Sequence, residues 1–140
     1  MKVLFDTNVV LDMMLDRAPF NQAAKKLISE SGYGRINGFI ASTSIMTIDY
    51  LLSKHTNRSK SREEIQALLS IVQIASVNQK TIQLALESNI RDLEDAIIAA
   101  AAEGVAANMI ATRDVRGFKG SNVMAYSPEM LLAMFEAGSN

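Results

Sequence analysis

Short apolar runs alternate with amphipathic segments along the whole chain. Each run has the length and composition of a strand that is buried on both faces. The runs cover residues 3–5, 38–41, 74–77 (the weakest), 108–112 and 123–126. Strands that alternate with helices favour a parallel sheet with helices on both faces. We therefore expect an α/β protein, a three-layer α/β/α sandwich with a central parallel sheet that forms a single domain over residues 1–140.

The segments between these runs carry apolar residues at helical spacing. The expected helices cover residues 8–15, 21–31, 44–54, 61–72, 81–87 and 92–103, and a last helix begins after Ser127. Thr7 and Asn8 are both suitable N-caps for the first helix, and residues 61–64 have the pattern of a capping box. The polar and basic stretch before that box, residues 54–60, is expected to be an exposed loop.

Composition excludes several classes of protein. The chain has no cysteine, so it has neither a disulfide framework nor a thiolate metal site. Its net charge is −1, so any contact with nucleic acid must rely on local groups of cations. No apolar run approaches the roughly 20 residues of a membrane helix, and the first residues lack the pattern of a signal peptide. We expect a cytoplasmic protein that makes no membrane contact.

Four aspartates stand at expected strand ends or at an expected helix start: Asp6, Asp92, Asp95 and Asp114. Ligands of an open α/β sheet bind beyond the carboxyl ends of its strands, so these acids converge if the first and fourth strands are neighbours. Crowded carboxylates raise one another's pKa, and a divalent cation removes that cost. Oxygen ligands select Mg²⁺ or Mn²⁺. The pattern predicts a metal site.

Each acid also has a purely structural interpretation. Asp92 and Asp95 fit the N-cap and third position of a helix, where an acid is favourable. Asp114 could be a turn residue ahead of Gly117. Asp6 is harder to explain in this way, because an acid directly after a buried run needs polar partners.

Three further groups of polar residues carry less information. Glu94 is expected to be a solvated acid that points away from Asp92. Asp12 and Asp16 are four residues apart on the first helix, and solvent-facing and site roles are equally open for them. His55, the single histidine, lies in the polar stretch 54–60 and gives little support to a Ser/His triad.

Several segments, taken together, resemble PIN-domain proteins, and most closely the VapC-like toxin ribonucleases and their relatives. They are FDTNVVLD at 5–12, RAPF at 17–20, DLEDA at 92–96, TRD at 112–114 with Phe118, and SPE at 127–129. The resemblance implies an Mg²⁺- or Mn²⁺-dependent active site that hydrolyses RNA phosphodiester bonds. It assigns catalysis to Asp6, Asp92, Asp95 and Asp114, metal binding to Asp6, Asp95 and Asp114, and supporting roles to Asn8 and Thr112.

One position departs from the family pattern. The helix after the second strand usually carries a second acid in this family, and the alignment places Thr47 there. Asp49 lies two residues on, about 200° around a helix, and would face elsewhere unless the register shifts. The resemblance therefore leaves open which of these two residues supplies the second site position.

Two groups of basic residues are candidates for phosphate contacts, which supply most sequence-independent affinity for RNA. The first is Lys54, Arg58, Lys60 and Arg62, which also fit a solvated surface; the second is Arg113, Arg116 and Lys119. Arg113 and Arg116 should lie beside the crevice and bind substrate. Neither group has the aromatic platform expected for stacking of single-stranded bases.

Three hypotheses about function follow. The main one is a metal-dependent endoribonuclease, with a role as the toxin of a toxin–antitoxin pair. Apolar residues of helices 44–54 and 61–72 could form a homodimer or antitoxin surface, although core burial explains them equally well. The first alternative is a PIN-like module that binds RNA or protein without cutting, motivated by Thr47. The second is a phosphoryl-transfer protein with Asp6 as nucleophile, against which Asn8 counts, because such enzymes usually have an acid there.

Overall fold

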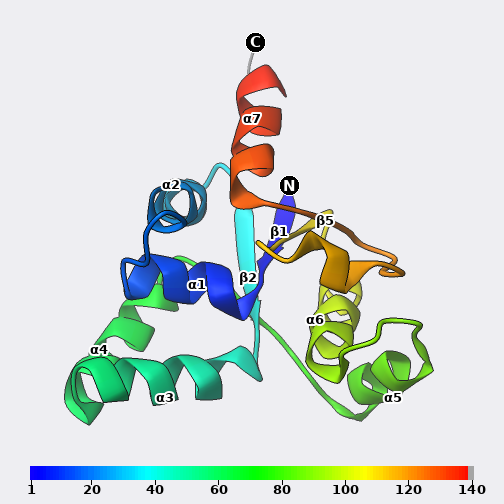
Figure 1. The fold of residues 1–140 in the computed structure, drawn as a ribbon, viewed down its shortest axis with the longest axis horizontal. Helices are drawn as coiled ribbons and strands as arrows, with labels where there is room; N and C mark the ends of the chain where they lie inside the picture. Colours follow the sequence, from blue (N-terminus) through cyan, green and yellow to red (C-terminus); the bar gives the residue numbers. More distant parts are fainter. Residues whose placement is uncertain (139–140) are drawn as a thin grey trace.

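Five parallel strands form one sheet in the computed structural model, which describes residues 1–138 (Figure 1). The strand order is β3-β2-β1-β4-β5, and every neighbouring pair is parallel. The strands are β1 (Lys2–Phe5), β2 (Asn37–Ala41), β3 (Gln73–Ala75), β4 (Met109–Ala111) and β5 (Met124–Tyr126). The expected parallel sheet is confirmed. Because β1 lies between β2 and β4, the residues that follow β1 and β4 emerge side by side at the carboxyl edge.

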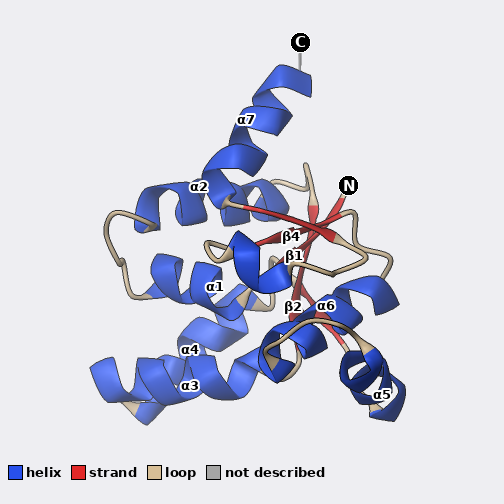
Figure 2. Cartoon of the chain, turned by 45° about the vertical axis from the view of Figure 1, so that its right-hand side comes forward, coloured by secondary structure: helices blue, strands red, loops and turns tan. Residues whose placement is uncertain are grey.

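Helices cover both faces of this sheet. They are α1 (Thr7–Met14), α2 (Asn21–Gly32), α3 (Ser44–His55), α4 (Arg58–Leu68), α5 (Gln79–Glu87), α6 (Leu93–Gly104) and α7 (Pro128–Gly138), with a 3-10 turn η1 (Val115–Phe118). Helices α1 to α4 lie on one side and α5 and α6 on the other (Figures 1 and 2). The predicted three-layer sandwich is confirmed.

Successive residues of β1 point to opposite faces of the sheet, so this strand contributes side chains to the hydrophobic core on each face. Val3 and Phe5 are buried in the core that also contains side chains of α1, α2, α3 and α7. Leu4 is buried in the other core, which the alanine-rich face of α6 dominates. After Lys2 the strand is apolar and buried on both faces, and the first polar side chain after β1 is Asp6.

The predicted start of α4 is wrong. The helix begins at Arg58, and Asn57 is its N-cap, with the side-chain oxygen accepting a hydrogen bond from the Lys60 amide at 2.8 Å. Ser61, which we expected to open the helix, is fully buried inside it and donates a 2.7 Å hydrogen bond to the Asp49 carboxylate. The expected loop at residues 54–60 is therefore mostly helical. Across residues 1–138, every helix is too short or too polar to cross a lipid bilayer.

Candidate functional site

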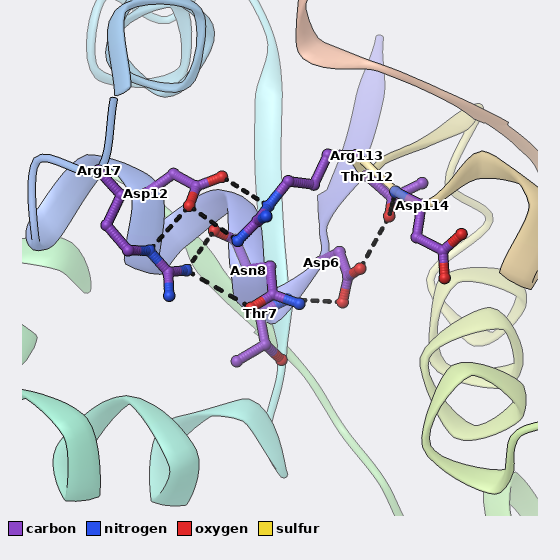
Figure 3. Close-up of polar contacts among 8 residues, drawn as sticks. All are labelled: Asp6, Thr7, Asn8, Asp12, Arg17, Thr112, Arg113 and Asp114. Carbon is purple, nitrogen blue, oxygen red and sulfur yellow. Dashed lines mark hydrogen bonds and ion pairs between the residues drawn. The ribbon is translucent and has the colours of Figure 1, made fainter. Parts of the chain in front are cut away.

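Asp6 is held at the junction of β1 and α1. Its backbone N–H donates to the Ala111 carbonyl at 2.9 Å, which extends the pairing of β1 with β4 by one residue. The carboxylate is buried and caps α1: Oδ1 accepts from the Thr7 amide at 2.8 Å. Oδ2 accepts from the Thr112 hydroxyl at 2.8 Å (Figure 3). Asp6, and not Thr7 or Asn8, is thus the N-cap, and both of its oxygens have assigned partners.

Thr112 connects two of the predicted acids. It follows β4 and is fully buried. Its hydroxyl donates to Asp6, and the same oxygen accepts a hydrogen bond from the Asp114 amide at 3.0 Å. One hydroxyl thus links the carboxylate that follows β1 to the backbone that follows β4. This link is consistent with the supporting role that we expected for Thr112.

Asp92 and Asp114 both act as local caps. Asp92 is the N-cap of α6, and its Oδ1 accepts from the Asp95 amide at 3.0 Å. Asp114 precedes η1, and its Oδ1 accepts from the Gly117 amide at 3.3 Å. The structural interpretations of these two acids are confirmed, but they do not remove the acids from the site. Asp92, Asp95 and Asp114 line one cavity at the start of α6.

Gly117 leaves space for two of these carboxylates. A Cβ atom at this position would lie 2.7 Å from Asp95 Oδ2 and 2.8 Å from Asp114 Oδ2, closer than real Cβ atoms approach other atoms. Both oxygens therefore converge on the point that a side chain of residue 117 would occupy. In the sequence, Gly117 is recognisable only as a turn residue. Nothing in the local pattern distinguishes it from any other turn glycine, because its partners come from α6 and the end of β4.

Burial and the negative charges of neighbouring acids change the ionisation of Asp95. The pKa of Asp95 is raised from 3.8 to about 6. Partial burial is the largest cause, and the negative charges of four neighbouring acids add to it. These neighbours are Asp6, Asp92, Asp114 and Glu94. The charge crowding predicted from the sequence is therefore present.

Burial also raises the pKa of Asp6, and the charges of Glu94 and Asp114 act in the same direction. The hydrogen bonds from Thr112 and Thr7 oppose this shift without cancelling it. Glu94 is exposed, as expected, but it belongs to the same electrostatic group. Sequence reasoning missed this role because helical spacing says nothing about the strand ends that face the first turn of α6.

A hard divalent cation fits two of these carboxylates, those of Asp95 and Asp114. Within residues 1–138, no group of three or more His, Cys, Asp or Glu side chains is arranged to hold a metal ion. The predicted trio of Asp6, Asp95 and Asp114 stays a prediction, and Asp6 accepts one hydrogen bond at each oxygen, from the Thr7 amide and the Thr112 hydroxyl. Asp95 and Asp114 alone direct one oxygen each to a shared point. Mg²⁺ commonly binds through one or two carboxylates and keeps several waters, so this pair fits such an ion.

Cations line the same cavity as the acids. The cavity has a volume of about 770 Å³, and Arg91, Arg116 and Lys119 belong to its walls. Arg116 lies where the sequence predicted. Arg91 was missed, although its position directly before Asp92 is a usable signal. A site with carboxylates on one side and cations on another can bind a phosphate group together with a divalent ion.

A comparison with protein families identifies the architecture. The family model described as PIN domain matches residues 2–116, which include all four predicted acids. The chain belongs to the PIN domain family. A comparison with curated proteins finds no match.

Solved structures with this PIN fold include three bacterial proteins. A toxin-antitoxin complex from Klebsiella pneumoniae aligns with a TM-score of 0.68 at 22% identity, covering 90% of this chain and 97% of that chain. FitAcB from Neisseria gonorrhoeae gives 0.70 at 17%, covering 91% and 98%. VapC20 from Mycobacterium tuberculosis, described as a Sarcin-Ricin loop cleaving toxin, gives 0.60 at 13%, covering 77% and 86%. At these identities the similarity shows the fold alone.

Asp49, the acid of α3, does not line the cavity of Asp92, Asp95 and Asp114. The charges that raise the pKa of Asp95 come from the end of β1, the start of α6 and the end of β4. Asp49 instead accepts hydrogen bonds from Ser53 and Ser61 at the contact between α3 and α4. Thr47 lies exposed on α3. The start of α3 does reach the site region, because the Ser44 and Thr7 hydroxyls are 2.7 Å apart.

Arg113 lies in a different place from the one expected. Its guanidinium contacts both oxygens of Asp12, with Nε–Oδ2 at 3.0 Å and Nη2–Oδ1 at 3.2 Å, and its centre is 4.4 Å from the Phe20 ring centroid. Arg17 approaches Asp12 from the other side at 2.9 Å (Figure 3). Asp12 is therefore a buried partner for two arginines. Of the predicted substrate-binding pair, only Arg116 lines the cavity.

Asn8 and Asp16 lie outside the acidic group. Asn8 is exposed, and both its carbonyl and its side-chain oxygen accept long hydrogen bonds from Arg17, at 3.3 and 3.4 Å. It therefore faces the Asp12 cluster (Asp12, Arg17 and Arg113) more closely than the carboxylates of α6. Asp16 is exposed and pairs with Lys25, an arrangement that lowers its pKa.

Proposed function

We propose that this PIN domain is a divalent-metal-dependent endoribonuclease that hydrolyses RNA phosphodiester bonds. The observation that carries the proposal is the cavity at the carboxyl edge, where three aspartates and three cations line one space. The cleaving activity in the description of VapC20, a structural neighbour, supports the same conclusion. The raised pKa of Asp95 adds support, because a bound cation would relieve the charge crowding that causes it.

In this proposal the residues in and around the cavity have separate roles in binding the metal, the backbone and the phosphates. Asp95 and Asp114 would hold Mg²⁺ or Mn²⁺, and the ion would activate water and neutralise charge on the phosphate. Asp92 caps α6 and so fixes the helix turn that presents Asp95. Asp6 and Thr112 orient the backbone that presents Asp114. Arg116 would contact phosphates of the RNA, as would Arg91 and Lys119.

A labelled RNA pool incubated with Mn²⁺, Mg²⁺ or EDTA tests the proposal. We expect cleavage that requires metal and that is lost in Asp6→Asn, Asp95→Asn and Asp114→Asn. Asp16→Asn is the matched control, because it makes the same change at an exposed acid outside the cavity. Absence of cleavage by the folded wild-type protein with either metal would overturn the proposal.

A second candidate is a PIN module that binds RNA or protein without cutting it. The observation that favours it is that Asp49, the acid of α3, does not line the cavity of Asp92, Asp95 and Asp114. This candidate predicts that RNA binds with the same affinity in Mn²⁺ and in EDTA and is recovered intact. Filter binding followed by denaturing gel electrophoresis of the recovered RNA separates the two candidates.

We also propose an antitoxin partner and a homodimer. Several structural neighbours were solved as toxin–antitoxin complexes. In this chain α3 exposes Met46 by 79% and Tyr50 by 62%, and the C-cap residue of α4, Leu69, is exposed by 41%. Tyr50→Glu should weaken either association, which light scattering of the isolated protein and co-purification with a co-expressed neighbouring gene product would measure. A monomer whose behaviour does not change on this substitution would contradict the homodimer.

A further inference from the structure

We propose that Gly117 is a positioning residue that holds open a seat for one cation between Asp95 and Asp114, and that a phosphate group of RNA completes this seat. Cation and RNA would then bind with positive coupling. The inference rests on the proposed function and deepens it. It concerns how many side chains of the protein coordinate the cation. That number determines how the affinity for the cation depends on bound RNA.

The first step is the space at Gly117. A methyl group there would meet the two carboxylate oxygens at 2.7 and 2.8 Å. Neither carboxylate is free to withdraw without a cost. Asp114 is held through its Oδ1 by the Gly117 amide and through its own amide by Thr112, and Asp95 sits in the first turn of α6. A side chain at residue 117 would therefore separate the two oxygens that converge there.

The second step is the number of carboxylates left for a cation. Asp6 accepts one hydrogen bond at each oxygen, whereas Asp95 and Asp114 each have an oxygen within 2.8 Å of the point that a Cβ atom of residue 117 would occupy. Asp49 is engaged by hydroxyl groups at the contact between α3 and α4. Over residues 1–138, no larger group of acidic, histidine or cysteine side chains is arranged to hold a metal ion. Asp95 and Asp114 are thus a two-carboxylate seat.

The third step is what fills the rest of the coordination shell. Mg²⁺ is octahedral and often combines one or two carboxylates with waters and substrate phosphates. Arg91, Arg116 and Lys119 line the same cavity and would hold a phosphate near the seat. A phosphate bound there is attracted both by these side chains and by the cation. Since coupling between two ligands is reciprocal, RNA must raise the affinity for the cation by the factor by which the cation raises the affinity for RNA.

Mn²⁺ binding measured by electron paramagnetic resonance tests the coupling without relying on catalysis. The probe is a short phosphorothioate-linked RNA, which resists hydrolysis, and the control is the same sequence with uncharged methylphosphonate linkages. We expect the charged oligonucleotide to raise the Mn²⁺ affinity of the wild-type protein at least about fivefold. The uncharged one should have no effect. Equal Mn²⁺ affinity with and without the charged oligonucleotide would overturn the inference.

Gly117→Ala tests the seat itself, and Gly104→Ala is its matched control. Gly104 ends α6, the helix that carries Asp95, and a Cβ atom there would meet nothing within 4 Å. We expect Gly117→Ala to weaken Mn²⁺ binding at least about tenfold and to lower the melting temperature in EDTA relative to Gly104→Ala, which should leave Mn²⁺ binding unchanged. Unchanged Mn²⁺ affinity in folded Gly117→Ala would refute the positioning role. If that variant does not fold, the oligonucleotide experiment on the wild type decides alone.

These outcomes are separable from those of the cleavage assay. Metal-dependent cleavage together with uncoupled Mn²⁺ binding would remove the two-carboxylate seat and leave the endoribonuclease. Coupled binding of Mn²⁺ and the oligonucleotide without any cleavage would keep the seat and favour the module that does not cut.

Discussion

Replacing Asp95 by Asn should stabilise the metal-free protein at neutral pH. The pKa of this carboxyl is raised in the folded protein, from 3.8 to about 6, so the folded state binds its proton more tightly than the unfolded state does. Stability therefore falls as pH rises from about 4 to about 6, and the whole penalty is present above pH 6. Asparagine has nearly the same shape and cannot ionise, so it removes the penalty.

The magnitude follows from the shift and from the exposure of the side chain. The shift corresponds to at most about 3 kcal/mol of unfavourable free energy. Because Asp95 is only partly buried, solvent screening reduces this to about 1–2 kcal/mol. Loss of a negative charge from the first turn of α6 costs about 0.3–1 kcal/mol in the opposite direction. We expect a net gain of about 1 kcal/mol, or a melting temperature higher by about 3 °C.

Thermal unfolding in EDTA at pH 7.5 and pH 4 measures this effect. The gain should appear at pH 7.5 and disappear at pH 4, where the wild-type carboxyl is largely protonated. Asp16→Asn should show no gain at either pH, because the pKa of Asp16 is lowered and not raised. Added Mn²⁺ should raise the melting temperature of the wild type more than that of Asp95→Asn. A loss of more than about 1 kcal/mol at pH 7.5 would refute the reasoning, since it would mean that Asp95 chiefly stabilises the start of α6.

Three other substitutions probe the surroundings of the acids. Asp12→Asn leaves two half-buried arginines without their buried charge partner, and urea denaturation should show a loss of about 2–4 kcal/mol; a loss below 1 kcal/mol would contradict this. Thr112→Val removes the hydrogen bond that lowers the pKa of Asp6. It should cost about 1–3 kcal/mol at pH 7.5 and less in acid, and a pH-independent loss would count against a charged acceptor. Arg91→Ala should weaken RNA binding and make its salt dependence shallower by about one phosphate contact, whereas an unchanged slope would place Arg91 outside the RNA path.

Much of the fold was predictable because burial on both faces leaves a simple pattern. The apolar runs along the chain are the strands, and the polar residue after the first run is the N-cap of α1. Strand order was not predictable in the same way. The position of β1 between β2 and β4 depends on which helices pack on which face, and no local pattern carries that information.

Helix starts were less predictable, because several residues compete for the same role. Ser61 has the right spacing for a capping box, yet Asn57 caps α4 and adds a turn at its start. The cause is a tertiary contact. Inside the helix, the Ser61 hydroxyl donates a hydrogen bond to the Asp49 carboxylate across the contact between α3 and α4. The same contact engages Asp49 Oδ1, and which of Asp49 and Thr47 supplies the second site position stays a prediction.

In the candidate site, the sequence pattern identifies the acidic residues, but only the fold determines which groups from other elements contact them. A carboxylate after a buried strand stands out in the sequence, but the direction of its oxygens is set by donors on other elements. The Thr112 hydroxyl donates a hydrogen bond to one oxygen of Asp6, while the lack of a side chain at Gly117 lets Asp95 and Asp114 approach one point. Four acids in sequence thus become one fixed anchor, one cap and one converging pair. Because a cation responds to the converging pair and not to the count of acids, the affinity for Mn²⁺ should depend more on Gly117 than on the identity of Thr47.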